Sequence, residues 1–167
     1  MSESKSNIKL KLVGLLVLIA TGITVYFTFE PKPEESWEKA IERGNHENVS
    51  YLIKKYPRLL NHKIDGYSPL IISAREGDTK VVSILLNAGA APEKLVGGIT
   101  ALHMACWTYR VEVVRLLLKR GVNPQVKDID KNTPLKFMQG NYQLLLERLK
   151  KDHKLAFEEI TKLLKGS

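Results

Sequence analysis

The 167-residue sequence contains a single cysteine, Cys106, so no disulfide can form within the chain. It has only 11 glycines and seven prolines, too few for a collagen-like or linker-dominated protein. Its four histidines are scattered, and no cysteine or carboxylate stands at a metal-ligand spacing from them. Neither a G-x-S-x-G turn nor a glycine-rich phosphate loop is present. We therefore expect a protein that is not an enzyme and that uses no metal or cofactor.

Positive charge is in moderate excess, since 26 Lys and Arg against 18 Asp and Glu give a net charge of +8. Such an excess attracts acidic proteins, anionic membranes or nucleic acids. However, Lys54, Lys55, Lys119 and Arg120 stand at the expected C-terminal ends of helices, where cations oppose the helix dipole. The segment 147–165 mixes basic with acidic side chains. We therefore expect a partner protein with an acidic surface and no binding of nucleic acid.

Strong hydrophobicity is confined to the start of the chain. Residues 12–29 carry no charge and, as a helix, would be about 27 Å long, close to the hydrocarbon thickness of a bilayer. Lysines precede this run and glutamates follow it, so the positive-inside rule places residues 1–11 in the cytoplasm. We predict that residues 12–29 are a transmembrane signal anchor and residues 30–34 a linker. A cleaved signal peptide and a buried globular helix are the alternatives.

The remainder of the chain is repetitive. Residues 68–92 align with residues 100–124 without a gap, at a period of 32. A hydroxyl residue followed by proline, as in Ser68-Pro69 and Thr133-Pro134, is typical of a helix start. An apolar stripe at helical spacing follows and ends at a glycine. One such helix pair cannot bury its stripe alone, so we expect the units to stack.

Three segments carry a resemblance to a known family. Ser68-Pro-Leu-Ile-Ile-Ser, Thr100-Ala-Leu-His-Met-Ala and Thr133-Pro-Leu-Lys-Phe-Met resemble the T-P-L-H-x-A signature of the ankyrin repeat. The resemblance covers residues 35–151 and implies an all-α ankyrin-repeat solenoid of about four helix-pair units. We expect a C-terminal capping helix in residues 152–167 to cover the open end.

The ankyrin resemblance also assigns individual residues. His103 stands at the family's helix-start histidine, which implies hydrogen bonds within and between loops and no catalytic role. Cys106 occupies a small-residue position, which implies a buried and unreactive thiol. Tyr109 departs from the family, which has a glycine between the two helices, as at Gly77. We therefore expect a reshaped or strained turn at Tyr109.

A protein-binding surface on the loop tips and first helices is a further implication of the resemblance. We expect Tyr67, Ile99 and Trp107 to face solvent and to form an apolar patch, because aromatic residues anchor many interfaces. For Trp107, packing against the turn at Tyr109 is the alternative. The candidate binding residues are Ile64, Asp65, Tyr67, Arg75, Glu76, Val96, Ile99, Trp107, Thr108, Ile129, Asp130 and Asn132.

The anchor and the exported repeats together are typical of a bacterial protein. We expect a monomeric, single-pass protein of the inner membrane, with its ankyrin domain in the periplasm. Small exported ankyrin-repeat proteins of bacteria include immunity proteins, so the resemblance implies an inhibitor that occludes a periplasmic antibacterial effector, such as a lipase or a cell-wall hydrolase. The alternatives are an envelope scaffold or stress-protection factor for resident periplasmic proteins, and a binder of lipid surfaces.

Overall fold

The computed structural model describes residues 33–145 and 151–166. The predicted cytoplasmic tail 1–11 and the predicted transmembrane segment 12–29 lie outside the described residues. Within the described part, no helix is long and apolar enough to cross a bilayer.

Eight α-helices and one short 3-10 helix make up the described part, which contains isolated β-bridges but no extended strand. The helices form four consecutive pairs. In chain order they are α2 (Pro33–Glu42) and α3 (His46–Lys55), then the 3-10 helix η1 (Pro57–Asn61), α4 (Pro69–Glu76) and α5 (Thr79–Asn87), α6 (Ala101–Trp107) and α7 (Val111–Lys119), and α8 (Pro134–Leu145) and α9 (Lys151–Lys165).

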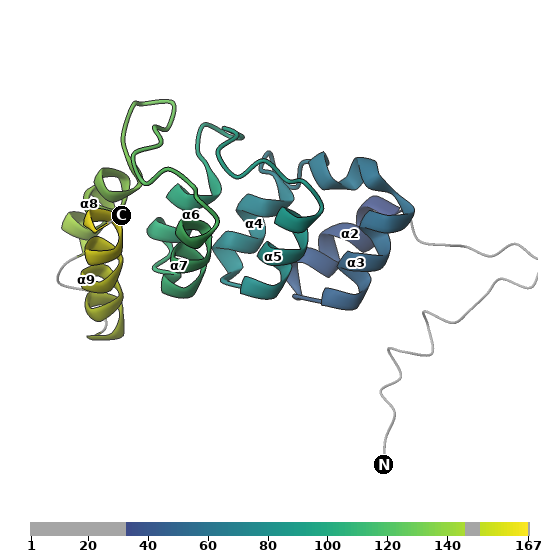
Figure 1. Ribbon diagram of the computed structural model, residues 1–167, viewed down its shortest axis with the longest axis horizontal. Helices are drawn as coiled ribbons and strands as arrows, with labels where there is room; N and C mark the ends of the chain where they lie inside the picture. Colours follow the sequence, from purple (N-terminus) through teal and green to yellow (C-terminus); the bar gives the residue numbers. More distant parts are fainter. Residues whose placement is uncertain (1–32, 146–150, 167) are drawn as a thin grey trace, which may run out of the picture. The chain divides into compact units, whose positions relative to one another are not determined.

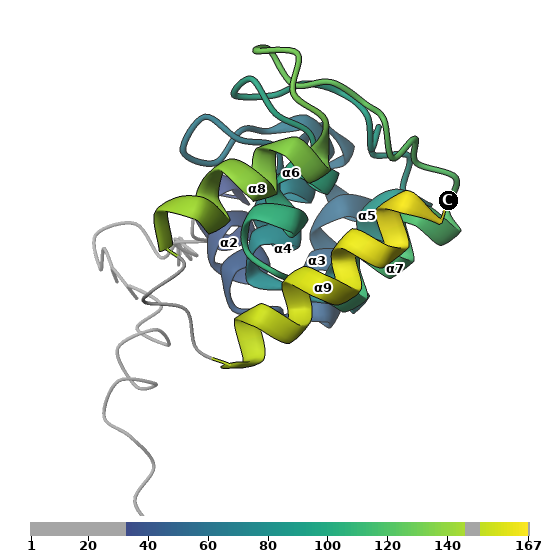
Figure 2. The ribbon, with the colours of Figure 1, turned by 90° about the vertical axis from the view of Figure 1, so that its left-hand side faces the viewer.

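The pairs stack side by side in chain order (Figure 1). Each first helix packs on the next first helix, giving an inner row of α2, α4, α6 and α8, and the second helices form an outer row of α3, α5, α7 and α9. The end-on view shows these two rows, with the connecting loops along one edge (Figure 2). The predicted all-α solenoid of helix pairs is therefore confirmed.

The fourth pair differs from the sequence-based expectation in one respect. The helix expected to cap the stack is α9, and it packs against α7 as the outer member of the fourth pair. The ion pair between Arg115 of α7 and Glu159 of α9 joins the two outer helices. The end of the solenoid is thus covered by the last repeat itself, whose inner helix α8 runs for 12 residues.

Side chains at the helix starts explain where the inner helices begin. The Ser68 hydroxyl oxygen accepts a hydrogen bond from the Ile71 N–H at 3.3 Å, ahead of Pro69. Thr100 caps α6 in the same way, and the His103 ring accepts a hydrogen bond from the Thr100 N–H. These caps satisfy amides that have no acceptor within the helix. A continuous core then runs through all four pairs and includes Trp37, Ile41, Leu59, Ile72, Leu85, Leu102, Leu117, Met138 and Ile160.

The turn between α6 and α7 contains Tyr109 where the turn between α4 and α5 contains Gly77. Both residues have a left-handed backbone, with φ of 57° for Tyr109 and 84° for Gly77. This conformation costs a residue other than glycine roughly 1–2 kcal/mol. The predicted strain at this turn is therefore confirmed. The Tyr109 ring lies beside the His153 ring of α9, with centroids 5.4 Å apart.

Three loops project from one edge of the stack, and we call them fingers. The first finger (64–67) and the second (96–99) are closed by antiparallel bridges from Ile64 to Tyr67 and from Val96 to Ile99. Both central residues of each turn have positive φ, which is the type I′ geometry that favours Asp-Gly and Gly-Gly. The third finger (128–132) is closed by the Asp128 N–H, which donates to the Asn132 carbonyl oxygen at 2.9 Å.

Candidate protein-binding surface

The three fingers pack against one another through the glycines of the second finger. A Cβ atom at Gly97 would lie 2.6 Å from Cε1 of Tyr67, so the tyrosine ring of the first finger covers this glycine. A Cβ atom at Gly98 would lie 3.0 Å from Cγ2 of Ile129. The Ile129 N–H also donates to the Gly98 carbonyl oxygen at 2.9 Å. The fingers therefore form a connected edge, and only glycine allows this close approach.

The largest exposed side chain on the inner helices is that of Trp107, at the end of α6. It is 40% exposed, and its ring lies 5.0 Å from the Phe137 ring of α8 at an interplanar angle of 44°. Phe137 in turn meets the buried His103 ring edge-on, with centroids 5.6 Å apart. Trp107 is thus held by aromatic contacts on one side while the other side faces solvent.

His103 connects α6 to the third finger. The Thr100 N–H donates to Nδ1 at 3.4 Å, so Nδ1 is the acceptor and Nε2 carries the proton that it donates to the Asn132 carbonyl oxygen at 3.0 Å. Burial lowers the pKa of His103, although the Asn132 carbonyl and the Asp128 carboxylate oppose this shift. The predicted bonds within and between loops are present, and the neutral ring acts as a structural link.

Cys106 is completely buried on α6, as its small-residue position predicted. Burial raises the pKa of its thiol strongly, which keeps the sulfur protonated at physiological pH. No group of three His, Cys, Asp or Glu side chains that could hold a metal ion occurs in residues 33–145 and 151–166.

The candidate binding residues fall into three classes of exposure. Asp65, Glu76, Trp107, Ile129 and Asp130 are exposed, whereas Tyr67, Arg75, Thr108 and Asn132 are half-buried. Ile64, Val96 and Ile99 are buried, with 2%, 8% and 9% of their surfaces exposed. The expectation that Ile99 faces solvent is therefore wrong. Its backbone pairs with Val96 at the base of the finger, which turns both side chains toward the core.

Reasoning from sequence missed two apolar residues near the fingers and the inner helices, Leu95, which is exposed, and Phe137, which is partly buried. Phe137 supports Trp107 but belongs to the fourth unit, where the repeat pattern is weak. Leu95 lies in the connection before the second finger and is 46% exposed. A large apolar residue directly after Glu93 and Lys94, in a connection made mainly of small residues, is the signal that could have identified it.

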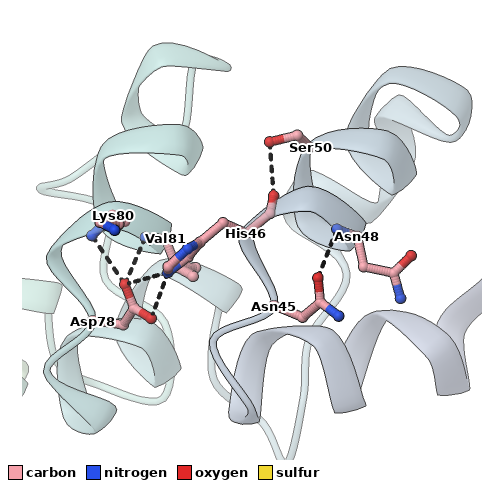
Figure 3. Close-up of polar contacts among 7 residues, drawn as sticks. All are labelled: Asn45, His46, Asn48, Ser50, Asp78, Lys80 and Val81. Atoms are coloured by element: carbon pink, nitrogen blue, oxygen red, sulfur yellow. Dashed lines mark hydrogen bonds and ion pairs between the residues drawn. The ribbon is translucent and has the colours of Figure 1, made fainter.

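A polar joint links the first repeat to the second at the starts of the outer helices α3 and α5 (Figure 3). Oδ1 of Asp78 accepts hydrogen bonds from the N–H groups of Lys80 and Val81, both at 2.9 Å, and so caps α5. Its carboxylate also lies 3.0 Å from Nε2 of His46, the first residue of α3. Partial burial raises the pKa of Asp78, but the Val81 N–H and the His46 ring outweigh it and lower the pKa overall.

Comparison with known proteins identifies the repeat. A family model described as ankyrin repeats (3 copies) matches residues 38–128, which is more than half of the chain. The chain is 36% identical over 77 residues to Ankyrin repeat and SOCS box protein 16 of Homo sapiens, covering 46% of this chain and 17% of that protein. It is 41% identical over 58 residues to the E3 ubiquitin-protein ligase KEG of Arabidopsis thaliana, covering 34% of this chain and 4% of the ligase.

Zygote-specific protein 3 of Chlamydomonas reinhardtii is 37% identical over 60 residues, covering 36% of this chain and 16% of that protein. The chain thus spans less than a fifth of the length of each of these relatives, and the similarity is confined to a short segment. With a family match over more than half of its length and four stacked helix pairs, the chain belongs to the ankyrin-repeat family.

Proposed function

We propose that this chain is a membrane-tethered inhibitor that binds a toxic protein through its inner helices and fingers and blocks that protein's active surface. Ankyrin repeats are modules for protein–protein interaction and are generally not enzymes. The observation that carries the binding site is the exposed Trp107 ring, supported from behind by Phe137.

The environment of Trp107 suits an interface anchor. Aromatic side chains bury a large area at a small entropic cost, and a few such residues supply most of the binding energy of an interface. Because Phe137 already restricts the Trp107 ring, little further ordering is needed when a partner covers it. Ile129, 72% exposed in the third finger, adds a second apolar group on the finger edge.

The membrane tether rests on the sequence of residues 12–29. An uncharged run of 18 residues preceded by lysines favours a single-pass anchor of the inner membrane, with residues 33–167 in the periplasm. A reporter that is active only after export, fused behind Ser167, should be active, and the full-length protein should stay in the membrane fraction. Release of a product lacking the first 30 residues would contradict the anchor and support a cleaved signal peptide.

An inhibitor and a scaffold differ in what they bind. Capture experiments with the full-length chain should recover a secreted effector, and the purified chain should then inhibit that effector at a molar ratio near one. Recovery of resident envelope proteins without inhibition of any activity would favour the scaffold. Binding to protein-free vesicles alone would favour a lipid-surface binder.

The binding site is tested by Trp107→Ala. Loss of an anchor residue should weaken partner binding by about 2 kcal/mol or more, roughly thirtyfold. Tyr51→Ala is the matched control, because Tyr51 is also an exposed aromatic residue, 54% exposed, but lies on the outer helix α3. If Tyr51→Ala weakens binding and Trp107→Ala does not, the partner uses the outer helices and this binding site is wrong.

A further inference from the structure

A pocket of about 300 Å³ lies between the connection that follows η1 and the connection that follows α5. We call it the loop-edge pocket, because it lies beside the first and second fingers. Trp107 is not part of its lining. Its apolar lining includes Leu60, Leu70 and Leu95, and its polar lining includes Lys63, Lys94 and Ser68. The ankyrin signature by itself does not assign this pocket a role in binding a partner.

The walls of the loop-edge pocket are held in place by the fingers. The Ile64–Tyr67 bridge closes the first finger and the Val96–Ile99 bridge closes the second. The Tyr67 ring lies against Gly97, which itself lines the pocket, so the two fingers are fixed to each other at this point. A pocket whose walls are already ordered binds a ligand without a large entropic cost.

The electrostatics of the loop-edge pocket favour an anion. Lys63 and Lys94 both line it and are exposed, and no Asp or Glu of the described residues is part of its lining. Neither lysine forms an ion pair within the described part of the chain. Ser68 and Leu70 belong to the start of α4, where the helix dipole adds partial positive charge. Two cations and a helix start therefore lie around a cavity whose lining is partly polar and partly apolar.

The size of the loop-edge pocket restricts the ligand further. Its volume is at the lower limit of pockets that bury drug-sized molecules, which span roughly 300–1,000 Å³. It therefore suits one apolar side chain with a carboxylate next to it, rather than a large free ligand. Leu95, partly exposed at the pocket, offers an apolar contact to such a side chain.

We propose that the loop-edge pocket binds a short acidic and apolar segment of the partner protein. One apolar side chain of that segment packs against Leu60, Leu70 and Leu95, while a flanking carboxylate pairs with Lys63 or Lys94. This inference rests on the proposed function, because it adds a second contact for the same partner beside the Trp107 surface. It gives the partner a defined local chemistry, an acidic residue adjacent to a leucine or phenylalanine.

The direct test uses a probe of that chemistry. The acetylated and amidated tripeptide Glu-Leu-Glu is titrated into the isotope-labelled full-length chain in a non-ionic detergent, and amide chemical shifts are followed by NMR. Shifts should concentrate at Lys94, Leu95 and Val96 and saturate at millimolar peptide. The matched peptides Glu-Ser-Glu and Lys-Leu-Lys, which lack the apolar group or reverse the charge, should bind at least about tenfold more weakly.

Charge-reversal variants supply the second arm. The double variant Lys63→Glu, Lys94→Glu should weaken Glu-Leu-Glu binding at least about tenfold. Lys54→Glu, Lys119→Glu is the matched control, because it makes the same change in net charge at two lysines that do not line the pocket. All four lysines are exposed, so both variants should keep the wild-type circular dichroism spectrum. The control variant should lower the melting temperature slightly, because Lys54 and Lys119 stand in the last turns of α3 and α7 and oppose the helix dipole there.

Several results would overturn the inference. Equal binding of the three peptides, shifts located elsewhere, or an equal loss in the two double variants would show that the pocket does not select this segment. Octanoate binding more tightly than Glu-Leu-Glu would assign the pocket to a free carboxylic acid instead of a protein segment.

Results with the captured partner separate this inference from the proposed function. If Trp107→Ala abolishes partner binding and Lys63→Glu, Lys94→Glu leaves it unchanged, the inference fails and the proposed function stands. If Trp107→Ala leaves partner binding unchanged while Glu-Leu-Glu still binds the pocket selectively, the proposed binding surface fails and the pocket keeps its ligand class.

Discussion

The second and third repeats, α4/α5 and α6/α7, share one backbone design but close their turns with different chemistry. In the second repeat, Gly77 provides the left-handed residue and Asp78 caps α5 with two hydrogen bonds. In the third, Tyr109 adopts the left-handed conformation, and Arg110 gives α7 no side-chain cap. Core packing therefore maintains the helix pair even where a turn is strained and a cap is missing.

The same two repeats use one position to contact the preceding repeat. Asp78 lies against His46, and Arg110, 32 residues later, donates from Nε to the Arg75 carbonyl oxygen at 2.8 Å. The position thus contacts the preceding unit in both repeats, through a carboxylate in one and a guanidinium in the other. Equivalent sequence positions keep their place in the solenoid but not their chemistry.

The inner helices of these repeats also diverge. His103 replaces Ile71 at one buried position, and Trp107 replaces Arg75 at the exposed end. Arg75 is paired with its neighbour Glu76 at 2.8 Å, so this end of the second repeat is polar. The exposed tryptophan is thus a feature of the third repeat that the second repeat lacks.

We expect the largest loss of stability from a substitution at the buried position of the inner helices that His103 and Ile71 share. His103→Leu keeps an apolar volume but leaves the Asn132 carbonyl and the Thr100 backbone without their bonds, which should lower the free energy of unfolding by about 3 kcal/mol. Ile71→Val, the control in the second repeat, should cost about 1 kcal/mol. Urea denaturation measures both. Equal losses would show that the bonds of His103 add no stability.

The pH dependence sharpens this prediction. Because the pKa of His103 is lowered in the folded state, the unfolded chain binds its proton more readily. Its contribution to stability is complete above the ordinary histidine pKa of about 6.5 and is lost as the pH falls below that value. Wild-type protein should therefore lose stability from pH 7 to pH 5, and His103→Leu should lose less over the same range.

Substitution of Asp78 and Arg110, which contact the preceding repeat, should give the next largest loss of stability. Asp78→Ala removes the cap of α5 and the contact with His46, and should cost about 2 kcal/mol. Arg110→Ala removes one exposed hydrogen bond and should cost about 0.5 kcal/mol. Because the pKa of Asp78 is lowered in the folded state, the difference between the two variants should shrink as the pH falls below about 4. Thermal denaturation at pH 7 and pH 3 tests this; a difference independent of pH would contradict it.

Substitutions of the two left-handed turn residues, Gly77 and Tyr109, should change stability by different amounts. Gly77→Ala places a side chain on a left-handed backbone, 2.8 Å from Cδ of Arg110, and should cost about 1 to 2 kcal/mol. Tyr109→Gly relieves the same backbone strain but loses the contact with His153, so stability should change by less than about 0.5 kcal/mol. Melting temperatures measure both changes. A large loss for Tyr109→Gly would mean that its ring contact outweighs the strain.

The exposed ends of the inner helices should affect stability least. Trp107→Ala removes the stacking on Phe137 and should cost about 1 kcal/mol, because the ring is already partly in water. Arg75→Ala breaks a pair between adjacent, partly exposed side chains and should cost less than about 0.5 kcal/mol. Urea denaturation compares them. If Trp107→Ala unfolds the domain, Trp107 is a core residue and its assignment as a binding anchor is wrong.

The sequence by itself determined the type and order of the helices. Apolar residues at helical spacing, caps such as Ser68 and Thr133, and a period of 32 residues are features of the sequence itself, so they predict helix pairs before any packing is known. The burial of Cys106 and the hydrogen bonds of His103 to the loops were implied by the ankyrin resemblance. The candidate binding residues in the fingers depended on the same alignment, but their exposure did not follow from it.

Tertiary structure decided which apolar side chains reach solvent. A two-residue finger turn pairs Val96 with Ile99 and buries both, whereas Ile129, in a finger closed by different bonds, remains exposed. The contacts of His46 with Asp78 and of Trp107 with Phe137 join residues about 30 positions apart in the chain. Such contacts depend on how closely adjacent repeats approach, and that distance is set by the packing of all the side chains between them.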